Sequence, residues 1–491
     1  MGGRYHSCMR LGVWVVVLAV SLAPRAFGQA SSQTAVQSLP DLGSVDSVLT
    51  PLLEKRLGDA IMREIKAQDP QYVDDPEISD YLQQLGSSLT GGRQDFEFFA
   101  IRDNTINAFA LPGGYVGVHT GLITTAETES ELASVLAHEV SHVTQRHIAR
   151  MIAQQQQMQM PMMAALAAAI LLGRARPDLA VGAAVGAQAA GLQAQLSYSR
   201  DFEREADRIG IERLDSAGFD AHAMATFFER MQRANRISED STMPGYFRTH
   251  PVTSERIADV QNKAATMPYR QHLDSPEFQM VRAKLRSEQG DARDAVNYFQ
   301  AAVREHRYSS ESAAHLGLAY ALLRANKVPE AQAEVEKIRA LGAASPMVEM
   351  LDARVRHAAG DVKGATEILA KSRDRYPTWR AITYAYIAGL QELGRNDEAI
   401  ATTRDALARY PRDARIYGMQ AKIYAMLGKR LLQHQAQAEV YALQGALPAA
   451  IEQLSLARSA GDGDFYQLSV VDARLKELRA QYTQEMKEAK R

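Results

Sequence analysis

Residues 128–143 read TESELASVLAHEVSHV, and this stretch predicts one amphipathic helix. Thr128, followed three residues later by Glu131, is a capping-box pattern that marks the start of a helix. Apolar residues then recur at helical spacing and form the stripe that we expect to be buried: Leu132, Val135, Leu136, Val140 and Val143. His138 and His142 are one turn apart and fall together beside this stripe. Two imidazoles in that arrangement can bind one metal ion at the edge of a core.

Glu139, between the two histidines, is predicted to be a general base. Its side chain projects beside the imidazoles, where it can take a proton from a metal-bound water without being a ligand. Metzincins need a glycine and a further histidine where this sequence has Gln145 and Ile148, so that subclass is excluded. His147 lies about 180° around the helix from His138, and we expect it to be a surface or packing residue. The third ligand must therefore come from another segment.

Residues 199–207, SRDFEREAD, supply carboxylates at a suitable spacing. Glu203 and Asp207 are four residues apart and share one helix face. We expect Glu203 to be the third ligand and Asp207 to accept the second ring proton of a ligand histidine, which fixes its tautomer. The alternative is an ordinary charged and solvated helix, which the upstream motif makes the weaker interpretation.

His250 and Arg256 are candidates for stabilising the negative oxygen of the transition state. Three protein ligands leave a fourth position on one zinc ion for water, whose pKa the metal lowers. Pro251 restricts the backbone at His250, so the imidazole is presented from a fixed loop. A neutral ring there could also occupy the fourth position as an inhibitory ligand, and a purely structural role is the third alternative.

A small sheet is expected before the motif helix. Residues 95–101 are typical of a strand, and residues 107–111 and 115–119 flank a Pro-Gly-Gly turn and predict a hairpin. Its first strand could lie at an edge of the sheet and hold a substrate peptide by strand addition. The expected fold of residues 29–267 is therefore a mostly helical α+β metallopeptidase domain.

The C-terminal part carries an internal repeat. Turn residues are spaced by 36, 34, 34 and 34 positions, at Gly290, Asn326, Gly360, Gly394 and Gly428. The first four are followed five residues later by an alanine, at Ala295, Ala331, Ala365 and Ala399. This is the tetratricopeptide period, and small residues allow close packing of paired helices. We expect an all-α solenoid over 268–480 that binds proteins, in preference to an unrelated helical bundle.

The last repeat is out of register. Gln433 follows Gly428 where an alanine is expected, whereas Gly445 is followed at that distance by Ala450. The final unit is therefore offset by half a repeat, as expected for a capping unit.

The N-terminus indicates export. Arg4 and Arg10 precede an apolar run over 11–23, and small residues at 26–28 offer a cleavage site, so residues 1–28 are predicted to be a signal peptide. A retained anchor is the alternative. Cys8, the only cysteine, would be removed with the leader, which leaves no disulfide. The mature chain would have 53 Lys+Arg against 58 Asp+Glu, a charge of −5 that predicts no nucleic-acid partner.

Residues 151–198 contain little charge and much Met, Ala and Gln. Neither apolar part of this segment is long enough for a convincing membrane span. We interpret it as a mobile lid over the cleft, able to rest against a membrane. Two ordinary buried helices are the alternative.

Together these motifs resemble the gluzincin peptidases that include HtpX and the CAAX prenyl endopeptidase. The matching segments are NAFALPGG at 107–114, the histidine–glutamate motif, residues 199–207, and Thr-His-Pro at 249–251 with the Arg-Ile pair that follows. The resemblance implies zinc ligands His138, His142 and Glu203, and Glu139 as the base. The resemblance also implies that Asp207 is a catalytic or a supporting residue.

The layout is closest to a periplasmic member of that family, because HtpX and the prenyl endopeptidase have membrane spans where this chain has 151–198. That resemblance implies a periplasmic, chaperone-like protease acting on misassembled outer-membrane β-barrel proteins, with a partner in their assembly machinery. Two other classes remain as alternatives: a repeat scaffold or chaperone with structural zinc, and an integral membrane protease. Structural zinc sites usually close with four cysteine or histidine ligands and need no glutamate between them.

Overall fold

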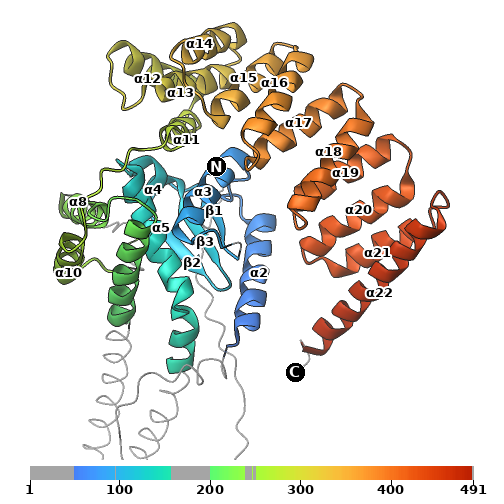
Figure 1. Cartoon of the computed structure of the whole chain (residues 1–491), viewed down its shortest axis with the longest axis horizontal. Coiled ribbons are helices and arrows are strands. Elements are labelled where there is room, and N and C mark those ends of the chain that lie inside the picture. Colours follow the sequence, from blue (N-terminus) through green and yellow to red (C-terminus); the bar gives the residue numbers. More distant parts are fainter. Residues whose placement is uncertain (1–48, 94, 156–198, 238–245, 247–249, 489–491) are drawn as a thin grey trace, which may run out of the picture. The chain divides into compact units, whose positions relative to one another are not determined.

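The computed structural model describes residues 49–93, 95–155, 199–237, 246 and 250–488 (Figure 1). The predicted signal peptide lies outside these residues, as does the predicted lid except for 151–155. Helix is the predominant structure, with one three-stranded sheet. None of the described helices is long and apolar enough to cross a membrane.

The sheet follows two helices, α2 (Pro51–Gln68) and α3 (Pro76–Leu89). Its strands are β1 (Glu97–Ile101), β2 (Ala108–Leu111) and β3 (Tyr115–His119), in the order β1-β3-β2. β3 pairs parallel with β1 and antiparallel with β2, which confirms the predicted hairpin and places β2 at an edge. Gly114 has a φ of 96°, and a Cβ there would lie 2.1 Å from the Asp95 carbonyl oxygen, so the turn requires glycine.

Two helices continue from the sheet, α4 (Thr120–Thr125) and the motif helix α5 (Glu129–Thr144). Thr128 caps α5 as predicted, because its Oγ1 accepts the Glu131 N–H at 3.2 Å. The Glu131 carboxylate returns to the backbone N–H of Glu127 at 2.7 Å, one residue before the expected partner. The predicted stripe is buried, with Val143 at its margin. α5 packs against α3, β2 and α8 (Ala223–Ile237), so the histidine pair sits beside the core.

Helical hairpins follow α10 (Ser254–Ala265). They are formed by α11 (Pro276–Ser287), α12 (Ala292–Arg304), α13 (Glu311–Arg324), α14 (Val328–Ala340), α15 (Pro346–Ala358), α16 (Val362–Arg375), α17 (Arg380–Glu392), α18 (Asn396–Arg409), α19 (Ala414–Met426) and α20 (Arg430–Leu443). All five predicted turn residues lie between paired helices and have positive φ, from 57° to 86°. The four alanines that follow them are buried, which confirms the close packing expected of the repeat.

The end of the solenoid is formed by α21 (Leu447–Arg458) and α22 (Phe465–Glu488). Gly445, with a φ of 74°, lies in the turn that joins α20 directly to α21. The half-repeat offset therefore corresponds to one additional turn between consecutive helices. These three helices share a hydrophobic cluster separate from the main core. Its members include Leu431, Leu454, Val471 and Leu475.

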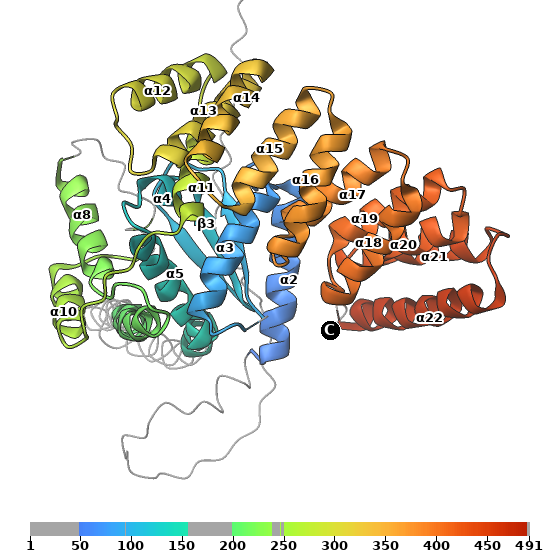
Figure 2. The ribbon, with the colours of Figure 1, turned by 45° about the horizontal axis from the view of Figure 1, so that its top comes forward.

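The repeats contact several helices of the peptidase part: α3 lies against α11 and α17, and α4 lies against α11 (Figure 2). Lys284 on α11 is 1% exposed, and its Nζ donates to Glu77 at 2.8 Å and to Asp75 at 2.6 Å. Glu77 also accepts from the Tyr320 hydroxyl and from Arg354, each at 2.9 Å. One hydrophobic core includes residues from both sides of Met267, so the predicted boundary there divides the sequence but not the packing.

Glu77→Ala is expected to lower the free energy of unfolding of the whole chain. Lys284 and Arg354 would lose a buried anion, and removing one partner of a buried pair costs about 3–5 kcal/mol. Because Asp75 still contacts Lys284, we expect a loss of about 3 kcal/mol in the free energy of unfolding. Chemical denaturation measures the change, with Glu330→Ala on the exposed surface of α14 as the control. An unchanged unfolding free energy would show that this interface contributes no stability.

Candidate metal centre

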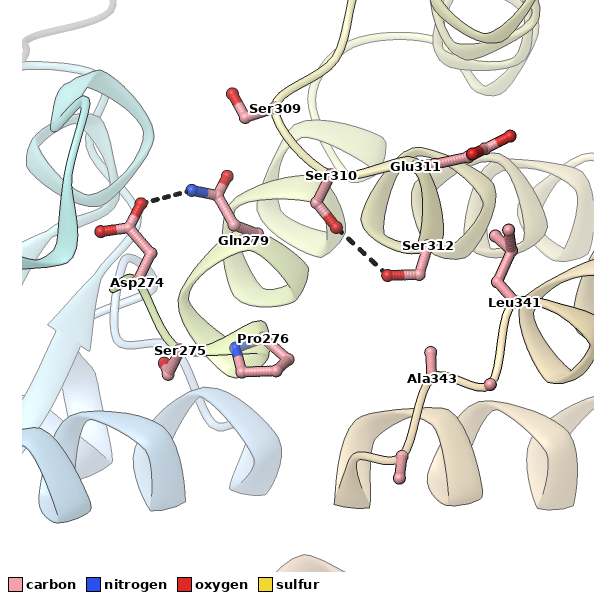
Figure 3. A pocket seen from close by; sticks show the side chains of 12 residues that line it. Asp274, Ser275, Pro276, Gln279, Ser309, Ser310, Glu311, Ser312, Leu341 and Ala343 are labelled. Atoms are coloured by element: carbon pink, nitrogen blue, oxygen red, sulfur yellow. Dashed lines mark hydrogen bonds between the residues drawn. The ribbon is translucent and has the colours of Figure 1, made fainter. Parts of the chain in front are cut away.

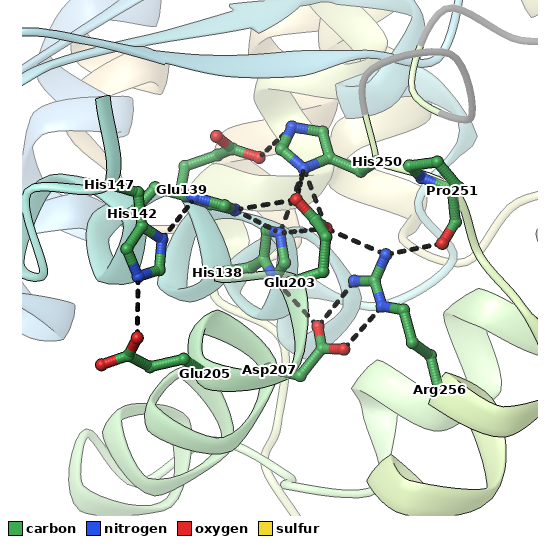
Figure 4. Close-up of polar contacts among 10 residues, drawn as sticks. All are labelled: His138, Glu139, His142, His147, Glu203, Glu205, Asp207, His250, Pro251 and Arg256. Atoms are coloured by element: carbon green, nitrogen blue, oxygen red, sulfur yellow. Dashed lines mark hydrogen bonds and ion pairs between the residues drawn. The ribbon is translucent and has the colours of Figure 1, made fainter. Parts of the chain in front are cut away.

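The predicted site residues come from α5, the helix of residues 199–216, the loop at 250–253 and the start of α10 (Figure 4). Gly210 lies where the second helix crosses α5, and a Cβ there would be 3.2 Å from the His138 backbone nitrogen. Its missing side chain lets the two helices approach closely. Glu203 and Asp207, two turns and one turn before Gly210, are thereby brought against the histidine pair.

Four side chains converge on one point. The Nε2 atoms of His138 and His142 are 3.0 Å apart, and each lies 3.4 Å from an oxygen of Glu203. His250 adds its Nδ1, 3.3 Å from His138 Nε2 and 3.0 Å from Glu203 Oε1. All four ligand atoms lie within 4.8 Å of one another. Tetrahedral zinc ligands at about 2.0–2.1 Å from the ion are about 3.3 Å apart, so this donor set fits one zinc ion.

Asp207 and Arg256 contact the four donor residues without being donors themselves. Asp207 Oδ1 lies 2.9 Å from His138 Nδ1, which leaves Nε2 facing the other donors. Arg256 donates to both Asp207 oxygens, at 2.7 and 2.8 Å. Its Nη1 lies 2.9 Å from Glu203 Oε2 and donates to the Pro251 carbonyl oxygen at 2.9 Å. Arg256 therefore orients two carboxylates, and its contact with the oxyanion stays a prediction.

Glu139 is 1% exposed and faces the same volume. Its Oε1 lies 3.4 Å from His250 Nε2, yet neither carboxylate oxygen makes a hydrogen bond with a described residue. A buried carboxylate without hydrogen bonds is costly, which is typical of a group reserved for a ligand or substrate. Tyr246, which the sequence reasoning missed, stacks on His250 with ring centroids 4.9 Å apart.

The electrostatics of the cluster favour a bound cation. Burial alone would lower the pKa of His138, but the nearby carboxylates of Asp207 and Glu203 outweigh it and raise that pKa to about 10. Burial would raise the pKa of Glu203, yet His250 and the other two histidines hold it well below its usual value. The pKa of Asp207 is also lowered, with Arg256 outweighing burial. Ionised carboxylates thus face the histidines, and positive charge in their midst is favourable.

His147 packs against Phe202, which is one of the two roles predicted for it, but its expected position around the helix is wrong. The expected half-turn separation from His138 assumed a continuous helix, but α5 ends at Thr144 and Arg146 has a φ of 53°. The chain therefore turns back and buries His147, whose Nδ1 lies 2.8 Å from His142 Nδ1. A left-handed residue that is not glycine leaves no clear signal in a single sequence, so this neighbour could not be predicted.

A surface hollow of about 590 Å³ lies elsewhere, among the loops at the start of the solenoid (Figure 3). It shares no residue with the four-donor cluster. Its polar side chains pair among themselves: Gln279 donates to Asp274 at 2.7 Å, and the hydroxyls of Ser310 and Ser312 are 3.1 Å apart. We therefore assign the chemistry to the four-donor cluster.

A histidine pair one turn apart, an intervening glutamate and a carboxylate from a second helix are together the arrangement of a metalloendopeptidase. Residues 74–264 match the family model of Peptidase family M48, and residues 280–346 and 356–423 match tetratricopeptide-repeat models. The chain is 32% identical over 479 residues to the beta-barrel assembly-enhancing protease of Escherichia coli strain K12, covering 94% of this chain and 96% of that one. It is 31% identical over 453 residues to the Yersinia pestis protein of the same name, covering 90% and 91%. The chain therefore belongs to the M48 peptidases, in the family of the beta-barrel assembly-enhancing proteases.

Asp207→Ala is expected to weaken zinc binding about 10–100-fold, because His138 loses the acceptor that fixes its tautomer. Competition between the apo-protein and a chromophoric chelator measures the dissociation constant. Asp201→Ala, an exposed change on the same helix, is the matched control. Equal affinities in the two variants would remove Asp207 from the metal centre.

Proposed function

We propose that this chain is a periplasmic zinc endopeptidase that removes misassembled outer-membrane β-barrel proteins and assists their assembly. The observation that carries the chemistry is the convergence of His138, His142 and Glu203 around a point that the buried Glu139 also faces. The name shared by both relatives supports the biological setting.

In this proposal His138, His142 and Glu203 hold one zinc ion. When bound, zinc lowers the pKa of a water molecule and polarises the carbonyl group of the substrate. Glu139 takes the proton of the attacking water and returns it to the amine of the departing peptide. The edge strand β2 holds the substrate backbone by strand addition.

His250 is proposed to keep the enzyme latent. Its Nδ1 lies among the ligand atoms, as an inhibitory fourth ligand requires. The ring is fixed by stacking on Tyr246, and the backbone N–H of His250 donates to the Tyr246 carbonyl oxygen at 2.7 Å. An oxyanion donor is the alternative role, because an imidazole N–H can donate a hydrogen bond to a negatively charged oxygen.

The remaining parts of the proposal concern location and partners. Residues 1–28 direct export to the periplasm, and the repeats over 268–480 bind the outer-membrane β-barrel assembly machinery and unfolded outer-membrane proteins. Residues 29–267 form the peptidase, and 151–198 act as its lid, with peripheral membrane contact. We expect no nucleic-acid partner, given the mild negative charge of the mature chain.

A structural zinc site in a scaffold protein is the competing function, and the presence of four donors is the observation that favours it. Glu139 argues against it, because a closed structural site has no use for a buried carboxylate that makes no hydrogen bond with a described residue.

Glu139→Gln is expected to abolish proteolysis while one zinc per chain stays bound, because the base is lost and the ligands remain. His142→Ala should instead lose the metal. Zinc content by elemental analysis and cleavage of a loosely folded outer-membrane protein provide the two measurements, with Glu212→Gln on the surface as control. Full hydrolysis by Glu139→Gln would contradict its role, and a complete zinc equivalent in His142→Ala would contradict the ligand set.

His250→Ala is expected to raise basal proteolysis, because it opens the fourth position to water. A transition-state donor would behave oppositely, with activity falling about 10²–10³-fold. Initial rates on the same substrate distinguish the two roles. Unchanged rates would leave His250 with a structural role only.

A further inference from the structure

A strained turn places His147 against the outer side of His142. Arg146 lies in the left-handed region, with a φ of 53°, which side chains other than glycine rarely adopt. Its guanidinium is held by Glu54, at 2.6 Å from Nε, and by the Leu49 carbonyl oxygen, at 2.5 Å from Nη2. A backbone outlier that the surroundings hold in place beside an active site indicates a functional requirement for that conformation.

The hydrogen bond between the two rings has a defined direction. His142 Nε2 faces Glu203 and His138, so a neutral His142 that binds metal through Nε2 carries its proton on Nδ1. The two Nδ1 atoms are 2.8 Å apart, and His147 must therefore accept at Nδ1. Its own proton is then on Nε2, which lies 3.2 Å from Glu205 Oε2.

The Glu205 end of this chain of contacts is also held in place by neighbouring side chains. Arg150 donates to the same Glu205 oxygen at 2.8 Å and holds the carboxylate in place. The ring of Phe202 stacks on His147, with centroids 4.3 Å apart and planes inclined by 14°. Arg150 covers the same phenyl ring at 4.5 Å from its centroid. His147 is 3% exposed, so water does not compete for its ring nitrogens.

We propose that His147 is a positioning residue for the metal centre, through a relay from Glu205 to His147 to His142. The relay fixes the tautomer and ring plane of His142 so that Nε2 points at the metal, as Asp207 does for His138 on the other side. This inference rests on the proposed role of His142 as a ligand. It assigns functions to His147 and Glu205 that the motif itself does not contain.

Two substitutions at position 147 separate hydrogen bonding from packing. His147→Phe keeps a flat ring stacked on Phe202 but has no acceptor, whereas His147→Asn keeps an oxygen near the position of Nδ1. Zinc affinity of the full-length apo-protein is measured by chelator competition, together with the thermal midpoint of each apo-protein. We expect His147→Phe to bind zinc about 10–100-fold more weakly and His147→Asn to stay within about threefold of the unmodified chain.

A second readout follows the proton itself. In the zinc-loaded chain the His142 Nδ1–H should give a slowly exchanging imidazole resonance in ¹⁵N-resolved NMR spectra. This resonance should persist in His147→Asn and be lost or exchange rapidly in His147→Phe. His315→Phe, which replaces a buried histidine bonded to Glu334 in the repeats, controls for general destabilisation and should keep both the resonance and the affinity.

The relay is refuted if His147→Phe binds zinc as tightly as the unmodified chain while His142→Ala loses it. Equal weakening in both position-147 variants, with a parallel fall of their apo thermal midpoints, would show a packing role and also overturn the proposal. Retention of zinc by His142→Ala would instead show that the ligand assignment beneath it is wrong.

Discussion

Three carboxylates, those of Glu139, Glu203 and Asp207, are buried within one small volume, and the rest of the peptidase part is arranged around their charge. Burying ionised groups without compensation costs several kcal/mol each. Arg256 compensates Asp207 and Glu203 directly, and a metal ion held by the histidines would compensate Glu203 further. Glu139 has only His250 Nε2 nearby, at 3.4 Å, and makes no hydrogen bond with a described residue, and that is the carboxylate whose proposed chemistry requires a mobile proton.

The same solution recurs where the repeats meet α3. Asp75, Glu77 and Asp80 lie at the start of α3, and Lys284, Arg354 and Arg380 approach them from α11, α15 and α17. Lys284, Glu77 and Asp80 are buried, so the loss of a partner leaves an uncompensated charge at each of these three residues. This pairing also fixes how the repeats align along α3, because each carboxylate must lie beside its own cation. The solenoid is therefore attached to the peptidase part by directional contacts as well as by a shared core.

Most of what could be predicted came from local patterns in the sequence. The cap at Thr128, the apolar stripe of α5 and the turn glycines of the repeats follow from spacing within a few residues, and the structure agrees. Contacts between distant segments could not be predicted, since Lys284 and Glu77 are 207 positions apart and nothing local links them. Arg256 was selected for the site, but its hydrogen bonds to Asp207 depend on how α10 meets the helix of 199–216. His147 was misplaced because the strained residue before it has no sequence signature.

The motif helix is fixed at both ends by residues outside it. At its start, the Glu129 N–H donates to Asp274 at 2.8 Å, and the Glu129 carboxylate accepts from the backbone and hydroxyl of Ser275 at 2.8 and 2.7 Å. Ser275 in turn caps α11, the first helix of the repeats. At its end, Arg146 is tied to Glu54 on α2, and a left-handed arginine costs about 1–3 kcal/mol. Because one helix carries His138, Glu139 and His142, a shift at either end moves all three together. The direct hydrogen bonds from the start of the first repeat therefore help to hold in place the helix that carries three of the site residues.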